Sequence, residues 1–123
     1  MIRVLDLERS LAFYKHAFGL DESHRWEFAT FTLLYLRDPQ SGFELELTAN
    51  KGQVEPYTHG TGYGHLAFCV PDLEAHRAKL LNMGCAVGEV KSLSGQNSSA
   101  RFYFLTDPDG YKIEVLQRGG HYV

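Results

Sequence analysis

Two segments of the chain carry apolar residues at helical spacing, and each lies between an aspartate and a glycine. An aspartate suits the N-cap of a helix because its side chain accepts a backbone N–H of the first turn, and glycine suits the residue after the last turn. The pattern therefore predicts two helices. The first runs from Asp6 to Gly19 and the second from Asp72 to Gly84, with apolar faces at Leu7, Leu11, Tyr14 and Phe18 in the first and at Leu73, Leu80 and Met83 in the second.

Strict alternation of apolar and polar residues marks two strands, 43–48 and 111–116. In the first, Leu45 and Leu47 point to one face while Glu44, Glu46 and Thr48 point to the other. In the second, Ile113 and Val115 oppose Glu114 in the same way. Shorter runs of β-favouring residues predict further strands at 26–28, 31–36, 65–70, 86–90 and 101–105.

The order of these elements repeats along the chain. Val4-Leu-Asp-Leu-Glu8 recurs as Val70-Pro-Asp-Leu-Glu74, and both halves end with Asp-Pro, a glycine, and a glutamate four residues later. Each half therefore reads β-α-β-β-β, a unit that cannot bury its sheet face without a partner. We expect an α+β protein in which two such modules form curved, mostly antiparallel sheets around a cleft. It would be a single domain with module 1 at about 1–50, a connecting segment at 51–63, module 2 at about 64–118 and a tail at 119–123.

Composition narrows the class of protein. The chain has 123 residues, of which 44% are hydrophobic and 22% charged, as in an ordinary globular protein. Its net charge of −3 argues against a nucleic-acid-binding surface, and its apolar runs are far shorter than the roughly 20 residues of a membrane span. Two cysteines and an N-terminus without a signal-peptide pattern predict a cytoplasmic protein.

Three residues at repeat-related positions could carry chemistry. Glu46 and Glu114 lie near the ends of equivalent strands, and His65 follows the glycine-rich stretch 60–64. A histidine with carboxylates is a mixed N/O ligand set that suits Zn, Ni, Co, Fe or Mn. The alternative from the pattern alone is that the two glutamates cover the solvent face of their strands.

Several longer motifs resemble glyoxalase I (lactoylglutathione lyase), of the vicinal oxygen chelate superfamily, over nearly the whole chain. They are Arg3-Val-x-Asp6-Leu-Glu-Arg-Ser-Leu-x-Phe-Tyr14, Glu46-Leu-Thr-x-Asn50, Gly62-Tyr-Gly-His65 and Asp107-Pro-Asp-Gly-Tyr-Lys-Ile-Glu114. The last motif and the β-α-β-β-β repeat occur across the superfamily. The two shorter motifs resemble the short bacterial branch of glyoxalase I.

The resemblance implies a set of site residues. The family holds its metal with His, Glu, His and Glu, of which Glu46, His65 and Glu114 match the last three; the repeat aligns the first ligand with a position ahead of Met1. His121 in the tail is a conceivable substitute. Arg3 and Asn50 match the positions that hold the γ-glutamyl end of glutathione, and a basic residue between 91 and 101 would meet its glycine carboxylate.

The implied reaction is isomerisation of the methylglyoxal–glutathione hemithioacetal to S-lactoylglutathione, which detoxifies methylglyoxal. Glu114 would be the general base, with Glu46 as ligand and second acid or base. The resemblance implies a homodimer with shared sites and a divalent metal, with Ni favoured over Co or Zn. Alternatives are another metalloenzyme of the superfamily (an epimerase, dioxygenase or thiol transferase), a non-catalytic small-molecule-binding dimer, or a catalytically silent relative.

Overall fold

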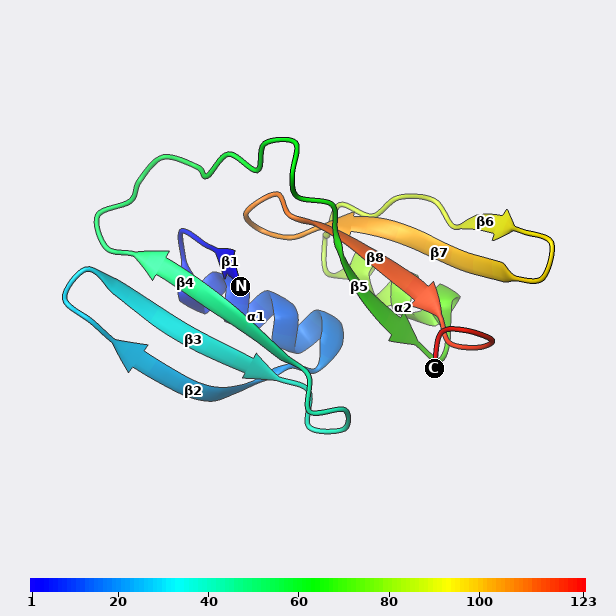
Figure 1. The fold of residues 1–123 in the computed structure, drawn as a ribbon, viewed down its shortest axis with the longest axis horizontal. Helices are drawn as coiled ribbons and strands as arrows, with labels where there is room; N and C mark the ends of the chain where they lie inside the picture. Colours follow the sequence, from blue (N-terminus) through cyan, green and yellow to red (C-terminus); the bar gives the residue numbers. More distant parts are fainter. The chain divides into compact units, whose positions relative to one another are not determined.

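The computed structural model describes all residues from Met1 to Val123, and they form two compact units, Met1–His59 and Gly60–Val123. Each unit holds one helix and one four-stranded sheet, in the order β-α-β-β-β (Figure 1). The α+β fold that the sequence predicts is thereby confirmed. The first unit contains β1 (Ile2–Arg3), α1 (Leu7–Phe18), β2 (Asp21–Glu27), β3 (Phe31–Arg37) and β4 (Glu44–Asn50). The second contains β5 (Leu66–Val70), α2 (Leu73–Asn82), β6 (Lys91–Ser94), β7 (Ser99–Thr106) and β8 (Lys112–Gln117).

The two sheets share one topology. Their strand orders are β1-β4-β3-β2 and β5-β8-β7-β6, and the last three strands of each unit form an antiparallel meander. The first strand of each unit joins the sheet in parallel beside the last one. The final strand of each unit is therefore internal to its sheet, and this is the strand that carries Glu46 or Glu114.

The helix boundaries follow the predicted caps. The Asp6 side chain accepts a hydrogen bond from the Arg9 N–H at 3.0 Å, and the Asp72 side chain accepts one from the Ala75 N–H at 2.9 Å. Gly19 ends α1 with φ of 70°, a left-handed conformation that glycine adopts without steric cost. Neither α1 nor α2 has the length and apolar content that a membrane-spanning helix requires.

The core of the first unit lies between α1 and one face of its sheet. The strands contribute leucines that are 2% exposed or less, namely Leu34, Leu36, Leu45 and Leu47. The expected helix face is only partly correct, because Tyr14 is fully buried whereas Leu7, Leu11 and Phe18 are half-buried. Ser10 and Ala17 are buried beside Tyr14, and their small side chains leave room for the helix to approach the sheet closely.

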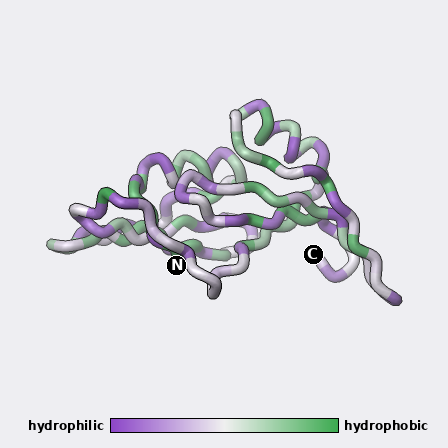
Figure 2. The backbone as a smooth tube through the Cα atoms, turned by 90° about the horizontal axis from the view of Figure 1, so that it is seen from above, coloured by the Kyte–Doolittle hydropathy of each residue, from purple (hydrophilic) through white to green (hydrophobic).

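The second unit repeats this arrangement. Leu73 and Leu80 of α2 are fully buried, as are Tyr103, Ile113 and Val115 of the sheet. The prediction that Met83 extends the apolar face is wrong: Met83 is the C-cap of α2 and 40% exposed. Hydrophobic and hydrophilic residues follow one another along the strands of both units, which is the pattern of sheets with one covered face (Figure 2).

Two predicted strands differ from the structure. β2 begins at Asp21, five residues before the predicted start, and the predicted strand at 86–90 is an irregular segment with one isolated bridge, Val87 to Leu105. Two backbone hydrogen bonds flank this bridge, from the Gly88 N–H to the Phe104 carbonyl at 2.7 Å and from the Thr106 N–H to the Ala86 carbonyl at 3.2 Å. The edge strand is instead β6, in a stretch where the sequence predicts no strand.

Candidate functional site

Arg3, Glu46 and Asn50 all lie on the face of the first sheet that α1 leaves uncovered. Glu46 and Asn50 are on β4, where they alternate with the buried Leu45 and Leu47. Arg3 of β1 is paired in register with Thr48, which lies on β4 between Glu46 and Asn50 on the same face. The parallel pairing of a two-residue strand thus places a guanidinium beside a carboxylate and an amide that lie more than 40 residues away in the sequence.

The Glu46 carboxylate has two hydroxyl neighbours on this face. The Thr48 hydroxyl donates to Glu46 Oε1 at 3.4 Å. Tyr35 of β3 is the direct cross-strand partner of Glu46; burial, and then the neighbouring Glu46 carboxylate, raise the pKa of Tyr35. Thr48 is part of the Glu46-Leu-Thr-x-Asn50 motif, whereas Tyr35 belongs to none of the sequence motifs. Pairing strand 31–36 with strand 43–48 in antiparallel register would have identified Tyr35.

His65 and Glu114 meet in the second unit. His65 precedes β5, Glu114 lies on β8, and Nε2 of the histidine is 3.2 Å from Oε2 of the glutamate. The side chains are 42% and 18% exposed, so the pair lies at the surface with the glutamate more enclosed. Phe104 is the cross-strand partner of Glu114, and its ring meets the His65 ring edge-on with centroids 5.4 Å apart. This apolar neighbour limits the orientations that the imidazole can adopt.

The turn before β8 determines where Glu114 lies. Asp107 is 5% exposed, and its Oδ1 accepts hydrogen bonds from the Asp109 N–H at 2.9 Å and the Tyr111 N–H at 2.8 Å. Gly110 takes a φ of 88° within this turn, a value that side chains other than glycine rarely adopt. The Tyr63 hydroxyl donates to the carbonyl of Lys112 at 2.8 Å. This bond connects the segment just before His65 to the first residue of β8.

The candidate basic residues between 91 and 101 differ in direction. Arg101 forms an ion pair with Glu74 of α2, so it points to the helix-covered face of its sheet. Lys91 is paired in register with Phe102, and Phe102 is paired with Leu116, two residues along β8 from Glu114. Lys91 therefore lies on the same face of the sheet as Glu114.

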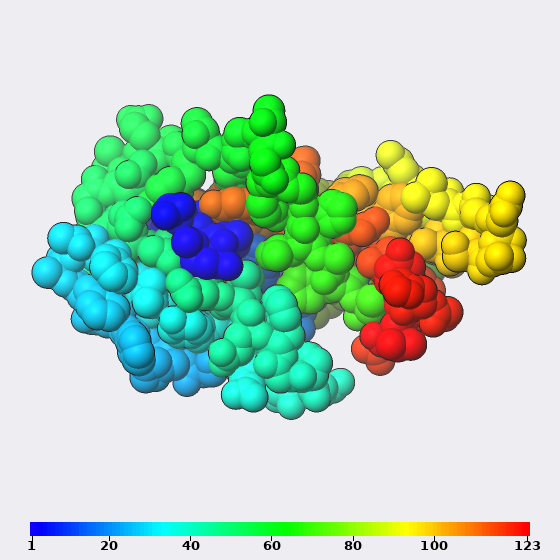
Figure 3. Space-filling model, in the orientation of Figure 1, coloured from blue at the N-terminus to red at the C-terminus, as the bar shows by residue number.

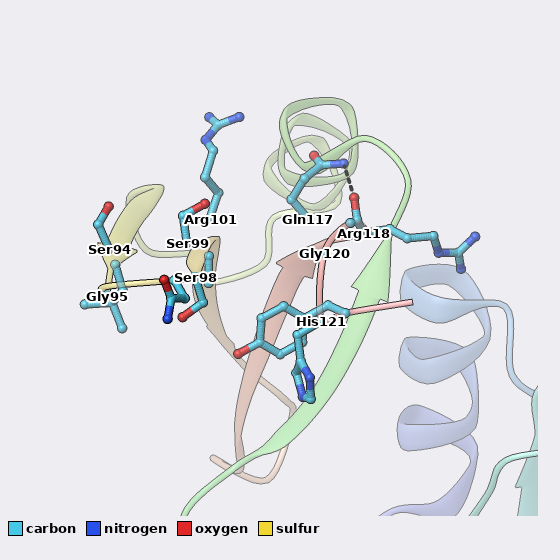
Figure 4. A pocket seen from close by; sticks show the side chains of 14 residues that line it. Ser94, Gly95, Ser98, Ser99, Arg101, Gln117, Arg118, Gly120 and His121 are labelled. Atoms are coloured by element: carbon cyan, nitrogen blue, oxygen red, sulfur yellow. Dashed lines mark hydrogen bonds between the residues drawn. The ribbon is translucent and has the colours of Figure 1, made fainter.

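A hollow of about 1180 Å³ lies elsewhere in the second unit, between the β6–β7 hairpin and the C-terminal tail. The hairpin and the tail are the yellow and red segments of Figure 3. His121 lines this hollow, whereas neither His65 nor Glu114 does. Figure 4 shows the guanidinium groups of Arg101 and Arg118 directed away from His121. The tail histidine thus lines a different surface from the one that His65 and Glu114 form.

The pair in the second unit fits a divalent metal. Two ligand atoms bound about 2.1 Å from one ion at a right angle lie roughly 3 Å apart, close to the observed separation of 3.2 Å between His65 Nε2 and Glu114 Oε2. Imidazole nitrogen with carboxylate oxygen is a donor set for Zn, Ni, Co, Fe or Mn. Within neither unit do three His, Cys, Asp or Glu side chains gather into a metal site.

Comparison with known proteins identifies the family of the chain. Residues 1–115 match the model of the Glyoxalase/Bleomycin resistance protein/Dioxygenase superfamily. The chain is 40% identical to a lactoylglutathione lyase of Haemophilus influenzae and 35% identical to one of Salmonella typhimurium, each over 95% of this chain and 88% of the relative. A structure of the trypanothione-dependent glyoxalase I of Leishmania major superposes with a TM-score of 0.77 at 34% identity, over 95% of this chain and 82% of that one. The family that the sequence motifs indicate is thereby confirmed: the chain belongs to the lactoylglutathione lyase (glyoxalase I) family, within the glyoxalase superfamily.

Proposed function

We propose that this protein isomerises the hemithioacetal of methylglyoxal and glutathione to S-lactoylglutathione, and so acts in methylglyoxal detoxification. The observation that carries the proposal is the convergence of His65 and Glu114, 3.2 Å apart on one face of the second sheet, in a chain of this family. The reaction is redox-neutral. One proton leaves the carbon that bears sulfur and a proton is added to the neighbouring carbonyl carbon, while the hydroxyl and carbonyl oxygens exchange roles.

Arg3 and Asn50 would bind the γ-glutamyl end of glutathione. Both lie on the open face of the first sheet, and the planar guanidinium of arginine can bind a carboxylate with two parallel hydrogen bonds. Lys91 is our choice for the glycine carboxylate, because it shares a sheet face with Glu114 whereas Arg101 is paired with Glu74. The peptide would thus be fixed at both ends by charge-assisted contacts.

Glu114 would take the proton from the carbon that bears sulfur. Its carboxylate is largely enclosed, at 18% exposed, and the neighbouring Phe104 ring limits the access of water. A carboxylate positioned within hydrogen-bond reach of the reacting carbon contributes on the order of 10²- to 10⁴-fold to such a proton transfer. Glu46 would serve as a ligand and as a second acid or base that returns a proton.

A divalent cation held by Glu46, His65 and Glu114, for which we favour Ni over Co or Zn, would polarise the two neighbouring oxygens of the substrate. We further propose a homodimer with shared sites, in which Arg3, Glu46 and Asn50 come from one chain and His65 and Glu114 from its partner. Sedimentation at micromolar concentration should then give a species of twice 13.9 kDa, and a 13.9 kDa species alone would contradict the dimer. We propose the cytoplasm as its compartment, on the low cysteine count.

The activity is tested by following thioester formation from methylglyoxal and glutathione in the ultraviolet, with Ni, Co and Zn added separately. Glu114→Gln should lower kcat on the order of 10²-fold or more, because the amide cannot accept the proton. Glu55→Gln is the matched control, since Glu55 is an exposed glutamate outside the sheets, and it should keep the parent activity. A wild-type protein that binds metal but makes no thioester would overturn the proposed reaction and favour another enzyme of the superfamily.

The identity of the thiol substrate is tested separately, by comparing glutathione with trypanothione in the same assay. The relative from Leishmania major is a trypanothione-dependent enzyme, so members of this fold differ in the thiol that they use. We expect glutathione to be the better thiol for this chain, because Arg3 and Lys91 offer two cations to the two carboxylate-bearing ends of that peptide. Equal or faster turnover with trypanothione would overturn the assignment of glutathione.

A further inference from the structure

The Glu46 carboxylate lies on the open face of the first sheet, where many strand glutamates extend freely into water. Here it lies beside Tyr35, its direct cross-strand partner, and beside Thr48, two residues along the same strand. Side chains paired in this way have Cβ atoms about 5 Å apart, within reach of a contact between a phenol hydroxyl and a carboxylate. Glu46 is therefore half-buried, with the Thr48 hydroxyl on its own strand and Tyr35 opposite it on β3.

The Tyr35 ring is itself held in place. His24 is the cross-strand partner of Tyr35 on its other side, and the two rings lie with centroids 6.4 Å apart at an interplanar angle of 35°. The ring of Trp26 packs edge-on against His24 at 5.2 Å. The Ser23 hydroxyl donates to the Tyr35 backbone carbonyl at 3.1 Å, at the bulge that interrupts β2. A side chain fixed by neighbours on one side can orient the group on its other side.

We propose that Tyr35 is a positioning residue for Glu46, and that its hydroxyl donates to the carboxylate and holds it in one orientation on the open face of the first sheet. This inference rests on the proposed function in one respect, the role of Glu46 as ligand and acid or base. A carboxylate without that donor samples several rotamers, and each departure from the reactive orientation reduces the fraction of productive complexes.

The decisive variant is Tyr35→Phe, which keeps the ring between His24 and Glu46 and removes only the donor. We expect kcat to fall about tenfold with little change in KM, since the contacts of Arg3 and Asn50 to glutathione do not involve this hydroxyl. Tyr122→Phe is the matched control, because Tyr122 is a half-buried tyrosine in the tail of the other unit. It should leave both constants at their parent values.

A second readout does not depend on turnover. Competition against a chelating dye measures the affinity for Ni²⁺, and Tyr35→Phe should weaken it several-fold, with a larger loss for Glu46→Gln. The melting temperatures of the metal-free Tyr35→Phe and Tyr122→Phe proteins should agree with the parent value. Unchanged kcat and unchanged Ni²⁺ affinity in Tyr35→Phe would overturn the positioning role. A loss that follows an equal loss of metal-free stability would also overturn it, because a structural role predicts that result.

The two proposals fail in distinguishable ways. If the wild-type protein makes no thioester, the proposed function fails, while the Ni²⁺ affinities of the parent, Tyr35→Phe and Glu46→Gln still test the orientation of Glu46. If the wild type is active, Glu46→Gln is inactive and Tyr35→Phe matches the parent, the proposed function stands and the role of Tyr35 is overturned. Thr48→Val adds a graded comparison, since its hydroxyl is 3.4 Å from the carboxylate and its removal should cost less than that of Tyr35.

Discussion

Replacing Asp107 tests whether a single buried side chain determines the position of the strand that carries Glu114. Asp107 is 5% exposed, and its Oδ1 accepts hydrogen bonds from the Asp109 and Tyr111 N–H groups within the turn. In Asp107→Ala both N–H groups lose this acceptor, and the buried Tyr111 N–H has no compensating access to water. Taking about 2 kcal/mol for the buried bond and about 1 kcal/mol for the half-buried one gives a loss of roughly 3 kcal/mol in the free energy of unfolding.

Asp107→Asn is the control that isolates this contact. The amide oxygen can take the place of Oδ1 and accept both bonds, although a neutral acceptor forms weaker bonds than a charged one. We therefore expect a loss of about 1 kcal/mol for asparagine. For a chain of this size, the melting temperature should fall by about 4 °C in Asp107→Asn and by about 10 °C in Asp107→Ala.

Thermal and urea denaturation followed by circular dichroism measure both losses, and the thioester assay run well below the melting temperature measures the effect on Glu114. Asp107→Ala should lower kcat more than Asp107→Asn, because β8 begins two residues after Gly110 and a loosened turn allows Glu114 to shift. Equal destabilisation by alanine and asparagine would refute the reasoning, since it would show that the oxygen at Oδ1 is not what stabilises the turn.

Further substitutions address the caps, a surface carboxylate and the open face of the first sheet. Asp6→Ala and Asp72→Ala should each cost about 1 kcal/mol of unfolding free energy, measured by urea denaturation, and serine at either position should recover most of it. The Thr32 hydroxyl and then Lys51 hold the pKa of Glu27 below its ordinary 4.5. The ionised Glu27 therefore stabilises the fold at neutral pH, and this stabilisation is lost as pH falls below about 4.5 towards the lowered pKa. Melting curves of Thr32→Val between pH 6 and pH 3 should therefore depend less on pH than those of the parent. Arg3→Ala should raise KM for the hemithioacetal about tenfold at nearly constant kcat, and a fall in kcat at constant KM would contradict a binding role.

The local signals of the sequence determined the secondary structure and the repeat. Each aspartate cap lies three residues before the N–H that it accepts, so a short window contains both partners. Alternation along 43–48 and 111–116 was enough to assign the covered and open faces, because a strand has a period of two residues. The repeat then predicted two equivalent units, and the family motifs named Glu46, His65 and Glu114.

Pairing between distant segments decided the rest. The polar stretch after Lys91 becomes an edge strand because it pairs with Phe102 and its neighbours, whereas 86–90 forms a single isolated bridge, Val87 to Leu105. Met83 is exposed because the helix ends there, which the apolar spacing alone did not reveal. The outcomes at β6 and at 86–90 depend on pairing between backbones, for which the spacing of residue types contains no signal.

On the open faces of the two sheets, too, the sequence determined one part and pairing between distant strands decided the other. Composition and motif identify Glu46 and Glu114 as candidates, but only the register places Tyr35 opposite Glu46 and Phe104 opposite Glu114. A shift of one residue in either pairing would move these neighbours to the helix-covered face. The sequence by itself therefore determined which carboxylates are candidates, and the tertiary structure decided what surrounds each of them, because a side chain's neighbours across a sheet come from strands that are remote in the chain.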